Sequence, residues 1–232
     1  MKINSDFSVR ATAHSAKMEW QPSPMLGVFR RPLDRVGNEV ARATTVVKYQ
    51  PNSKFSPHVH TGGEEFIVLE GVFQDEHGDY PAGSYIRNPP QSSHTPGSES
   101  GCVILVKLWQ FSPEDRTHVR LTTDSMPALK RQEGNQDVSY IPLYGDENED
   151  VSIQHWAPNA TIELAAKNGY EIFVLSGRFS ESGEVFEEHS WLRLPVGSSL
   201  NVLVGENGAK VWIKQDHLKY VDSQIARVEQ AV

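Results

Sequence analysis

Short apolar segments separated by polar turns recur along the whole chain. Each is rich in β-branched and aromatic residues and is bounded by Gly, Pro, Asn or Ser, a pattern typical of β-strands. Helical periodicity is weak and is confined to stretches near 124–132 and the C-terminus. Many short strands at regular spacing predict an all-β sandwich or barrel. The expected strands are 43–49, 65–73, 84–87 and 102–109 in the first half, and 152–156, 171–179, 190–194 and 209–213 in the second.

Two of these segments, 65–73 and 171–179, are largely apolar on both faces. A sheet with one face in water would instead alternate apolar and polar residues. We therefore expect a second layer over the outer face, supplied by the other half of the chain, an N-terminal strand or a second subunit. A homodimer whose barrels pack together would satisfy this requirement.

The two halves of the chain repeat each other. EFIVLEGVF and EIFVLSGRF, the segments at 65–73 and 171–179, match at an offset of 106 residues. SYIRNPPQSSH, which begins at residue 84, matches SWLRLPVGSSL at the same offset, and YQPNS resembles WAPNA at an offset of 107. A shared offset over several segments indicates duplication. The predicted organisation is a first β domain at 1–122, a polar linker at 123–137 and a second β domain at 138–232.

Charge and composition narrow the choice of partners. The 232 residues carry a net charge of -8, which on average repels a polyanion, so no nucleic-acid partner is expected. No apolar run is long enough to cross a bilayer, and the N-terminus lacks the apolar stretch of a secretory signal. We therefore expect a cytoplasmic protein with no membrane partner. Cys102, the single cysteine, is interpreted as a small buried strand residue.

Four residues of the first half form a candidate metal site. His58 and His60 are two residues apart, so both imidazoles can point to the same side of a strand. Glu64 begins the next strand, and His94 follows a proline turn. Three imidazoles and a carboxylate suit one divalent transition metal per chain, with zinc expected first and iron, manganese or nickel as alternatives. No further side chain stands out as a general base, so the catalytic residues are unknown.

The spacing of these residues resembles both motifs of the cupin superfamily. The motifs read His58-x-His60-x3-Glu64-x6-Gly71 and Gly83-x5-Pro89-x-Gln91-x2-His94. Asn52 and Gln91 stand at turn positions where cupins often have glycine. The chain is more closely similar to the ChrR-like cupins through HVHTGGEEFIVLEGVFQDE, GSYIRNPPQSSHTPGSESGC and SWLRLPVGSS. This resemblance implies a bicupin, two tandem jelly-roll barrels of the double-stranded β-helix type, with a metal held by the four residues above.

Glu65 is the alternative carboxylate ligand. The cupin spacing to Gly71 favours Glu64 instead. Glu171 occupies the position of Glu65 in the repeat, although the second half contains no histidine pair. Glu65 is therefore expected to have a structural role, as a salt bridge or a loop anchor.

The second half acts as an internal control for the metal site. The offset of 106 residues places Leu164, Ala166, Tyr170 and Leu200 at the four ligand positions. None of these residues is a metal ligand of the expected kind. The second barrel is therefore interpreted as a degenerate cupin whose interior is filled or dry.

Two classes of function follow from this site. Four protein ligands around tetrahedral zinc leave no open position and describe a regulatory site. The ChrR-like resemblance then implies a module that binds a small molecule or senses oxidative stress. The resemblance covers only the cupin part of the anti-sigma factors, because their N-terminal sigma-binding domain has no counterpart here. A six-coordinate metal would leave two open positions, which implies a dioxygenase, or an isomerase, acting on a small diketone or hydroxyaryl ketone.

Overall fold

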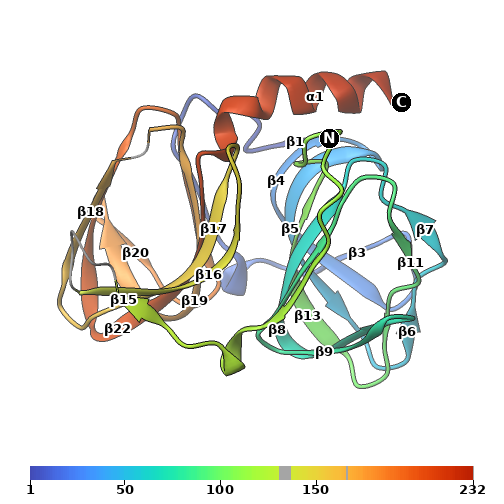
Figure 1. The fold of residues 1–232 in the computed structure, drawn as a ribbon, viewed down its shortest axis with the longest axis horizontal. Helices are drawn as coiled ribbons and strands as arrows, with labels where there is room; N and C mark the ends of the chain where they lie inside the picture. Colours follow the sequence, from blue (N-terminus) through green and yellow to red (C-terminus); the bar gives the residue numbers. More distant parts are fainter. Residues whose placement is uncertain (131–136, 166, 232) are drawn as a thin grey trace. The chain divides into compact units, whose positions relative to one another are not determined.

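The computed structural model describes residues 1–130, 137–165 and 167–231, and it consists mainly of β-strands (Figure 1). The chain divides into two compact units. Unit 1 contains Met1–Ser5, Glu19–Ser125 and Asp222–Val232, and unit 2 contains Asp6–Met18 and Met126–Val221. Each unit contains one large antiparallel sheet, which confirms the all-β prediction. No helix in the described part of the chain is long and apolar enough to cross a membrane.

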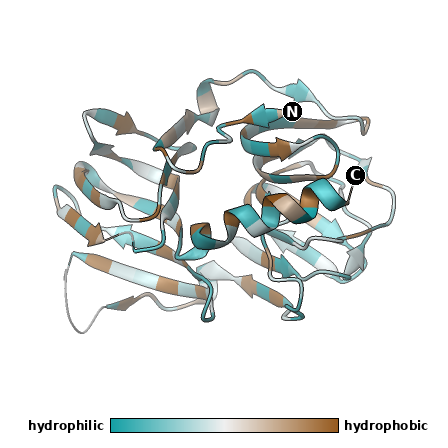
Figure 2. Ribbon diagram, turned by 90° about the horizontal axis from the view of Figure 1, so that it is seen from above, coloured by the Kyte–Doolittle hydropathy of each residue, from teal (hydrophilic) through white to brown (hydrophobic). Residues whose placement is uncertain are grey.

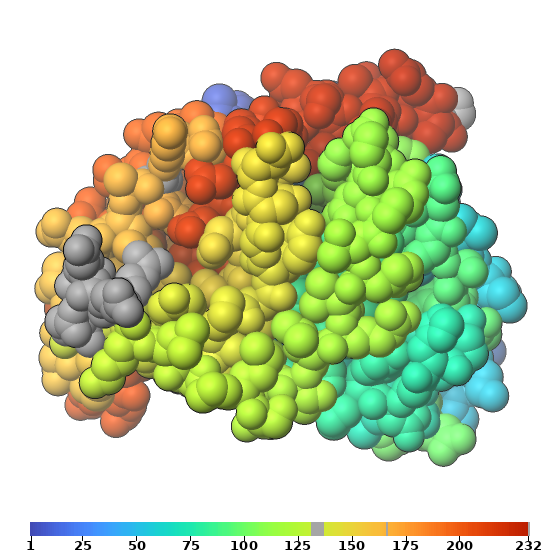
Figure 3. Space-filling view, in the orientation of Figure 1, coloured from blue at the N-terminus to red at the C-terminus, as the bar shows by residue number. Residues whose placement is uncertain are grey.

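The main sheet of unit 1 has the strand order β1-β4-β5-β13-β8-β10-β14. These strands are β1 (Lys2–Ile3), β4 (Val28–Gly37), β5 (Ala41–Tyr49), β13 (Cys102–Leu108), β8 (Glu64–Asp75), β10 (Ser84–Asn88) and β14 (Val119–Thr122). Short strands extend it, namely β3 (Gln21–Pro22), β6 (Ser53–Lys54), β9 (Gly78–Pro81) and β12 (Gly97–Ser98). A separate two-stranded ladder joins β7 (His58–Val59) to β11 (Ser93–His94). Figure 3 shows the segment around β14, in light green, at the surface of this unit.

The sheet of unit 2 has the strand order β15-β16-β17-β22-β19-β21-β2. These strands are β15 (Leu129–Lys130), β16 (Val138–Gly145), β17 (Asp150–Trp156), β22 (Ser199–Gln215), β19 (Tyr170–Glu181), β21 (Ser190–Leu194) and β2 (Ala11–His14). Strands β18 (Thr161–Ala165) and β20 (Glu184–Phe186) pair with β22 and β19. Short 3-10 helices lie at η1 (Ser15–Lys17), η2 (Thr123–Ser125) and η3 (His217–Tyr220). The weak helical periodicity near 124–132 does not correspond to an α-helix at residues 124–130, which contribute to η2 and β15.

The C-terminal helix α1 (Val221–Gln230) packs on unit 1. Arg42 Nε donates to Gln224 Oε1 at 2.8 Å, and Gln224 Nε2 donates to the Gln110 carbonyl at 3.0 Å. Arg227 donates to the Phe111 carbonyl at 2.7 Å. Figure 2 shows apolar and polar residues alternating along this helix, as expected for one apolar face against protein and one polar face in water.

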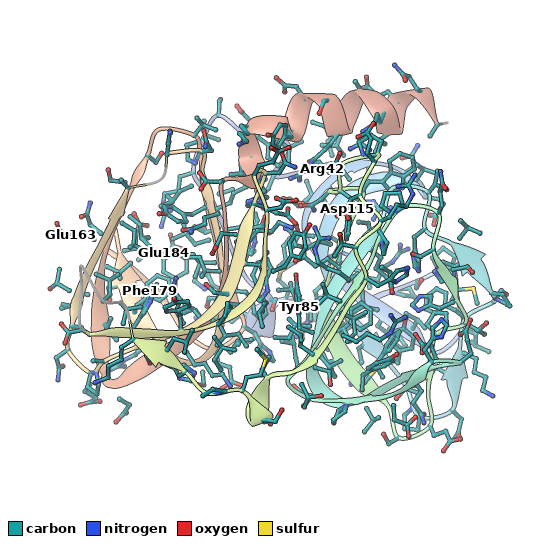
Figure 4. The ribbon with its side chains drawn as sticks, in the orientation of Figure 1. Arg42, Tyr85, Asp115, Glu163, Phe179 and Glu184 are labelled. Carbon is teal, nitrogen blue, oxygen red and sulfur yellow. The ribbon has the colours of Figure 1, made fainter. Side chains whose placement is uncertain are left out.

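One face of each sheet forms an apolar core. In unit 1, Phe66, Val68, Ile104 and Val106 belong to a single buried cluster. In unit 2, Phe179 is 1% exposed and lies inside the barrel, whereas Glu163 lies on its outer side (Figure 4). This alternation is the period of two expected for strands with one buried face.

The opposite sheet face carries a buried polar network that is repeated in both units. In unit 1, the Tyr85 hydroxyl (Figure 4) donates to Glu65, and the strand register places Arg87 and Lys107 beside Glu65. The Lys107 ammonium donates to Thr44 Oγ1 at 2.9 Å. The expected structural role of Glu65 thus has a concrete basis in the strand pairing.

Unit 2 repeats this arrangement around Glu171. Trp191 Nε1 donates to Glu171 Oε1 at 2.8 Å, and the register places Arg193 and Lys214 beside Glu171. His217 Nε2 lies 3.1 Å from the other carboxylate oxygen. The glutamate flanked by an arginine and a lysine is therefore part of the duplicated framework rather than of the metal chemistry.

Asn52 and Gln91, the two departures from the cupin pattern, both adopt the left-handed conformation that favours glycine. Their φ angles are +62° and +73°. The repeat partner of Asn52 is Asn159, with φ +59°, and that of Gln91 is Gly197, with φ +80°. Asparagine tolerates this region better than most residues. Both loops thus keep the backbone that a glycine would allow.

Candidate metal centre

The ladder between β7 and β11 brings the histidines together. His58 and His94 are direct cross-strand partners. The His60 backbone extends the pairing, since its N–H donates to the Ser92 carbonyl at 2.8 Å and its carbonyl accepts from Gln91 at 2.9 Å. The distances between ring centroids are 5.0 Å for His58 and His60, 5.3 Å for His58 and His94, and 4.5 Å for His60 and His94.

A glycine corner sets the position of Glu64 relative to the histidines. A Cβ at Gly62 would collide with the Trp109 ring, and a Cβ at Gly63 would collide with the Phe111 ring. Gly63 also has φ +79°, and its carbonyl accepts from the Trp109 N–H at 3.1 Å. The chain therefore turns from the histidines into β8 through two glycines, because any side chain there would collide with an aromatic ring.

One potential ligand atom from each of His58, His60, Glu64 and His94 lies within 4.8 Å of the others. Glu64 Oε2 is 3.6 Å from His60 Nε2 and 3.3 Å from His94 Nε2. Both Nε2 atoms are buried and make no hydrogen bond. Buried polar atoms are normally satisfied, so this arrangement fits ligands directed at a shared cation. The four residues could hold a metal ion.

The Nδ1 atoms of His58 and His94 each contact an oxygen of the protein. His58 Nδ1 lies 3.0 Å from the Ser56 carbonyl, and His94 Nδ1 lies 3.2 Å from Asp75 Oδ2. A carbonyl or carboxylate partner keeps the proton on Nδ1 and leaves Nε2 as the ligand atom. Burial lowers the pKa of His60, which favours the neutral imidazole that a metal requires.

Asp75 contacts the candidate ligand His94, and the sequence analysis did not identify it. Its carboxylate accepts from the His77 backbone N–H at 2.8 Å and from the Tyr80 hydroxyl at 3.2 Å, besides contacting His94. Burial acts to lower the pKa of His94, but the hydrogen bond to Asp75 and the charge of Glu64 outweigh it and raise that pKa. The residue stands at the end of β8, where the sequence indicates only a polar hairpin. The spacing to His94 carries no signal for such a contact.

We expect Asp75→Asn to weaken metal affinity by about 10–100-fold, because partners of metal-bound imidazoles orient the ring and fix its tautomer. The measurement is a competition titration with a chromogenic chelator. Asp79→Asn is the matched control, because Asp79 accepts a hydrogen bond from Gln74 on the neighbouring strand and does not contact a histidine. Equal affinities for wild type and Asp75→Asn would exclude an orienting role for Asp75.

A cavity of about 520 Å³ adjoins the candidate ligands. His58, His60 and Glu64 form part of its wall. The remaining wall is largely apolar and comes from β4, β5, β13 and the loop before β7. It includes Met25, Val28, Val47, Tyr49, Phe55, Ile104, Val106, Leu108 and Trp109.

Unit 2 has a packed interior at the corresponding positions. Tyr170 and Leu200 belong to its buried apolar cluster, and Leu164 packs against that cluster. The Tyr170 hydroxyl donates to the Ala165 carbonyl at 2.9 Å. Ala166 lies outside the described residues. Side chains thus occupy the space that the histidines and the cavity occupy in unit 1.

Comparisons with known proteins agree with the fold. Residues 8–112 match the ChrR cupin-like domain. A candidate dioxygenase from Nostoc punctiforme superposes with a TM-score of 0.75 at 14% identity, covering 89% of this chain and 82% of that one. Ylba from E. coli gives a TM-score of 0.70 at 13% identity, with coverages of 91% and 93%.

An oxalate decarboxylase from Lactobacillus farciminis gives a TM-score of 0.61 at 9% identity, with coverages of 89% and 86%. At these identities the likeness shows the fold alone. A search of curated proteins found no significant match. Residues 8–112 are thus similar to the ChrR cupin-like domain, and the fold of the chain is that of a bicupin.

Proposed function

We propose that unit 1 binds one divalent transition metal through His58, His60, Glu64 and His94, and that it converts a small, largely apolar molecule there. One observation carries this proposal. Three of the four candidate ligands, His58, His60 and Glu64, form part of the wall of a cavity of about 520 Å³. A regulatory zinc site would instead be closed on all sides.

The donor set suits six-coordinate iron, manganese or nickel, since four protein ligands then leave two positions toward the cavity. When bound, such a metal supplies Lewis-acid chemistry and a chelation point for two substrate oxygens. The apolar walls exclude water and strengthen every electrostatic contact inside. Tyr49 adds a hydroxyl to this wall, and burial raises its pKa well above the usual value, so it remains a hydrogen-bond donor.

The reaction class that we propose is oxygen-dependent cleavage of a chelating diketone or hydroxyaryl ketone. For a β-diketone, one C–C bond breaks and both atoms of dioxygen enter the products, a carboxylic acid and an α-keto aldehyde. The structural neighbour from Nostoc punctiforme, itself described as a candidate dioxygenase, supports this choice.

Oxidative-stress sensing through a thiol is less well supported. Cys102 is 4% exposed, and burial raises the pKa of its thiol to about 11. Reactive cysteines are accessible and have lowered pKa values. The single cysteine of the chain is thus a buried strand residue, as its sequence context indicates.

Metal removal followed by reloading tests the proposal. We expect one metal per chain, and we expect chelating diketones to consume oxygen only with the iron- or manganese-loaded protein. Metal content by mass spectrometry, diketone binding by absorbance and oxygen uptake are the measurements. Diketone binding without turnover would contradict the enzymatic proposal and favour a binding or sensing module. Stoichiometric tetrahedral zinc that excludes the diketone would contradict an open site.

A further inference from the structure

Arg30 places a positive charge in the wall of the otherwise largely apolar cavity. It lies on β4 between Val28 and Pro32, and its cross-strand partner is Val47 of β5. Val28 and Val47 both line the cavity, as does Arg30. The strand pairing therefore directs Arg30 to the interior side of the sheet, on the same face as the substrate space.

The Arg30 guanidinium makes no hydrogen bond or ion pair with any described residue of the chain. Glu39, which also lines the cavity, is exposed and lies beyond ion-pair distance of Arg30. A cation that faces a cavity without a protein partner has its donors available for a ligand. Arginine is especially suited to carboxylates, because its planar fork matches their two oxygens.

Arg30 also borders a second, smaller hollow of about 180 Å³. Arg35 lines this hollow, and burial together with the charge of Arg30 lowers the pKa of Arg35. Two guanidiniums and the single carboxylate of Glu39 thus line this smaller hollow. The local excess of positive charge contrasts with the net charge of -8 for the chain.

The charges in the cavity also favour a ligand that carries a carboxylate. A divalent metal held by Glu64 retains one positive charge, and Arg30 adds a second one at another point of the wall. A ligand with an ionised chelating end and one further anionic group would neutralise both charges. A neutral diketone would occupy the metal and leave Arg30 without a ligand.

From this geometry we propose that Arg30 binds a carboxylate of the substrate, so that the natural substrate is an acid with a chelating head and an apolar spacer. This inference rests on the proposed function, since it assigns a substrate class to the same cavity. Arg30 would be a binding and specificity-determining residue, separate from the metal ligands.

The test uses nickel-loaded full-length protein, in which binding is measured by calorimetry without turnover. The probes are pentane-2,4-dione and 4,6-dioxoheptanoate, which share the chelating head and differ in the carboxylate tail, with a longer homologue to vary the reach. We expect wild type to prefer a carboxylate-bearing ligand by about 10-fold or more. Arg30→Met should remove this preference and leave pentane-2,4-dione affinity unchanged, while Arg30→Lys should restore part of it.

Arg31→Met is the matched control, because Arg31 stands on the opposite strand face, with its guanidinium 4.0 Å from the Trp20 ring. It should retain the full preference. Binding of pentane-2,4-dione without any preference for either acid in wild type would overturn the Arg30 inference alone. A preference that persists in Arg30→Met would do the same. Failure of all these diketones to bind would overturn the proposed function as well.

Discussion

Glu64→Gln should abolish stoichiometric metal binding and leave unit 1 folded, whereas Glu65→Gln should destabilise unit 1 and leave metal binding at the folded site intact. The two glutamates are adjacent in sequence and point to opposite faces of β8. This pair of variants therefore separates the residue needed for metal binding from the residue needed for the stability of unit 1.

Loss of metal in Glu64→Gln follows from the position of the carboxylate. Its Oε2 is the anionic atom close to the orphaned Nε2 atoms of His60 and His94. The glutamine amide keeps the shape of the side chain and removes its charge. Metal affinity should therefore fall by about 100-fold or more, which exceeds the usual effect of losing a residue that only hydrogen-bonds to a metal ligand. The Glu64 side chain is 12% exposed and stabilises no buried cation of the framework, so the fold should remain.

Loss of stability in Glu65→Gln follows from the buried network on the other face. Glu65 is 1% exposed, it accepts from the Tyr85 hydroxyl, and it lies between Arg87 and Lys107 in the strand register. Removing one member of a buried charge network leaves the others uncompensated, at a cost of about 3–5 kcal/mol. Glu171→Gln should produce a similar loss in unit 2, because the same network recurs there.

Metal titration and denaturant unfolding of both variants test which glutamate is the metal ligand and which one stabilises the fold. His118→Ala is a further control, because His118 is exposed and lies outside the group of candidate ligands. Stoichiometric metal in Glu64→Gln together with its loss from folded Glu65→Gln would reverse the assignment of the two residues.

The strand pattern predicted most central strands within a few residues of their observed bounds, but it covered only 209–213 of β22 (Ser199–Gln215). The expected segment 65–73 lies within Glu64–Asp75, and 190–194 coincides with Ser190–Leu194. The pattern missed Val28–Gly37 and Val138–Gly145, which each contain a proline. Both prolines lie at a shift in strand register, where a missing N–H is tolerated.

The repeat also explains which parts of the site were predictable. His58, His60, Glu64 and His94 differ from their repeat partners, so the comparison of the two halves isolates them. Asp75 and Arg30 were not predicted for a different reason. The role proposed for Asp75 rests on a tertiary contact and that for Arg30 on a cavity wall, and neither leaves a spacing pattern in the sequence. The pairing of β2 with β21 in unit 2 has no signal either, because the sequence segments that match between the two halves do not include residues 11–14.

The glycine corner gives the second large effect, because Gly63→Ala should disturb both the fold and the metal site. The added Cβ would meet the Phe111 ring, and the backbone at φ +79° already disfavours any side chain. Overpacking costs about 1–3 kcal/mol and the left-handed backbone about 1–2 kcal/mol. The expected loss in the free energy of unfolding is therefore about 2–5 kcal/mol, with weaker metal binding because Glu64 follows directly.

Gly183→Ala separates these two costs. Gly183 has φ +80°, nearly that of Gly63, but a Cβ there meets nothing within 4 Å. It should lose only the backbone contribution of about 1–2 kcal/mol and keep full metal affinity. Denaturant unfolding and metal titration of both variants provide the comparison. Equal losses of stability, with metal affinity unchanged in Gly63→Ala, would show that Phe111 yields to the new methyl group. Gly169 forms the same corner against Leu218 in unit 2, where none of the four ligand positions holds a histidine. The corner is therefore a duplicated framework feature on which unit 1 has placed its candidate ligands.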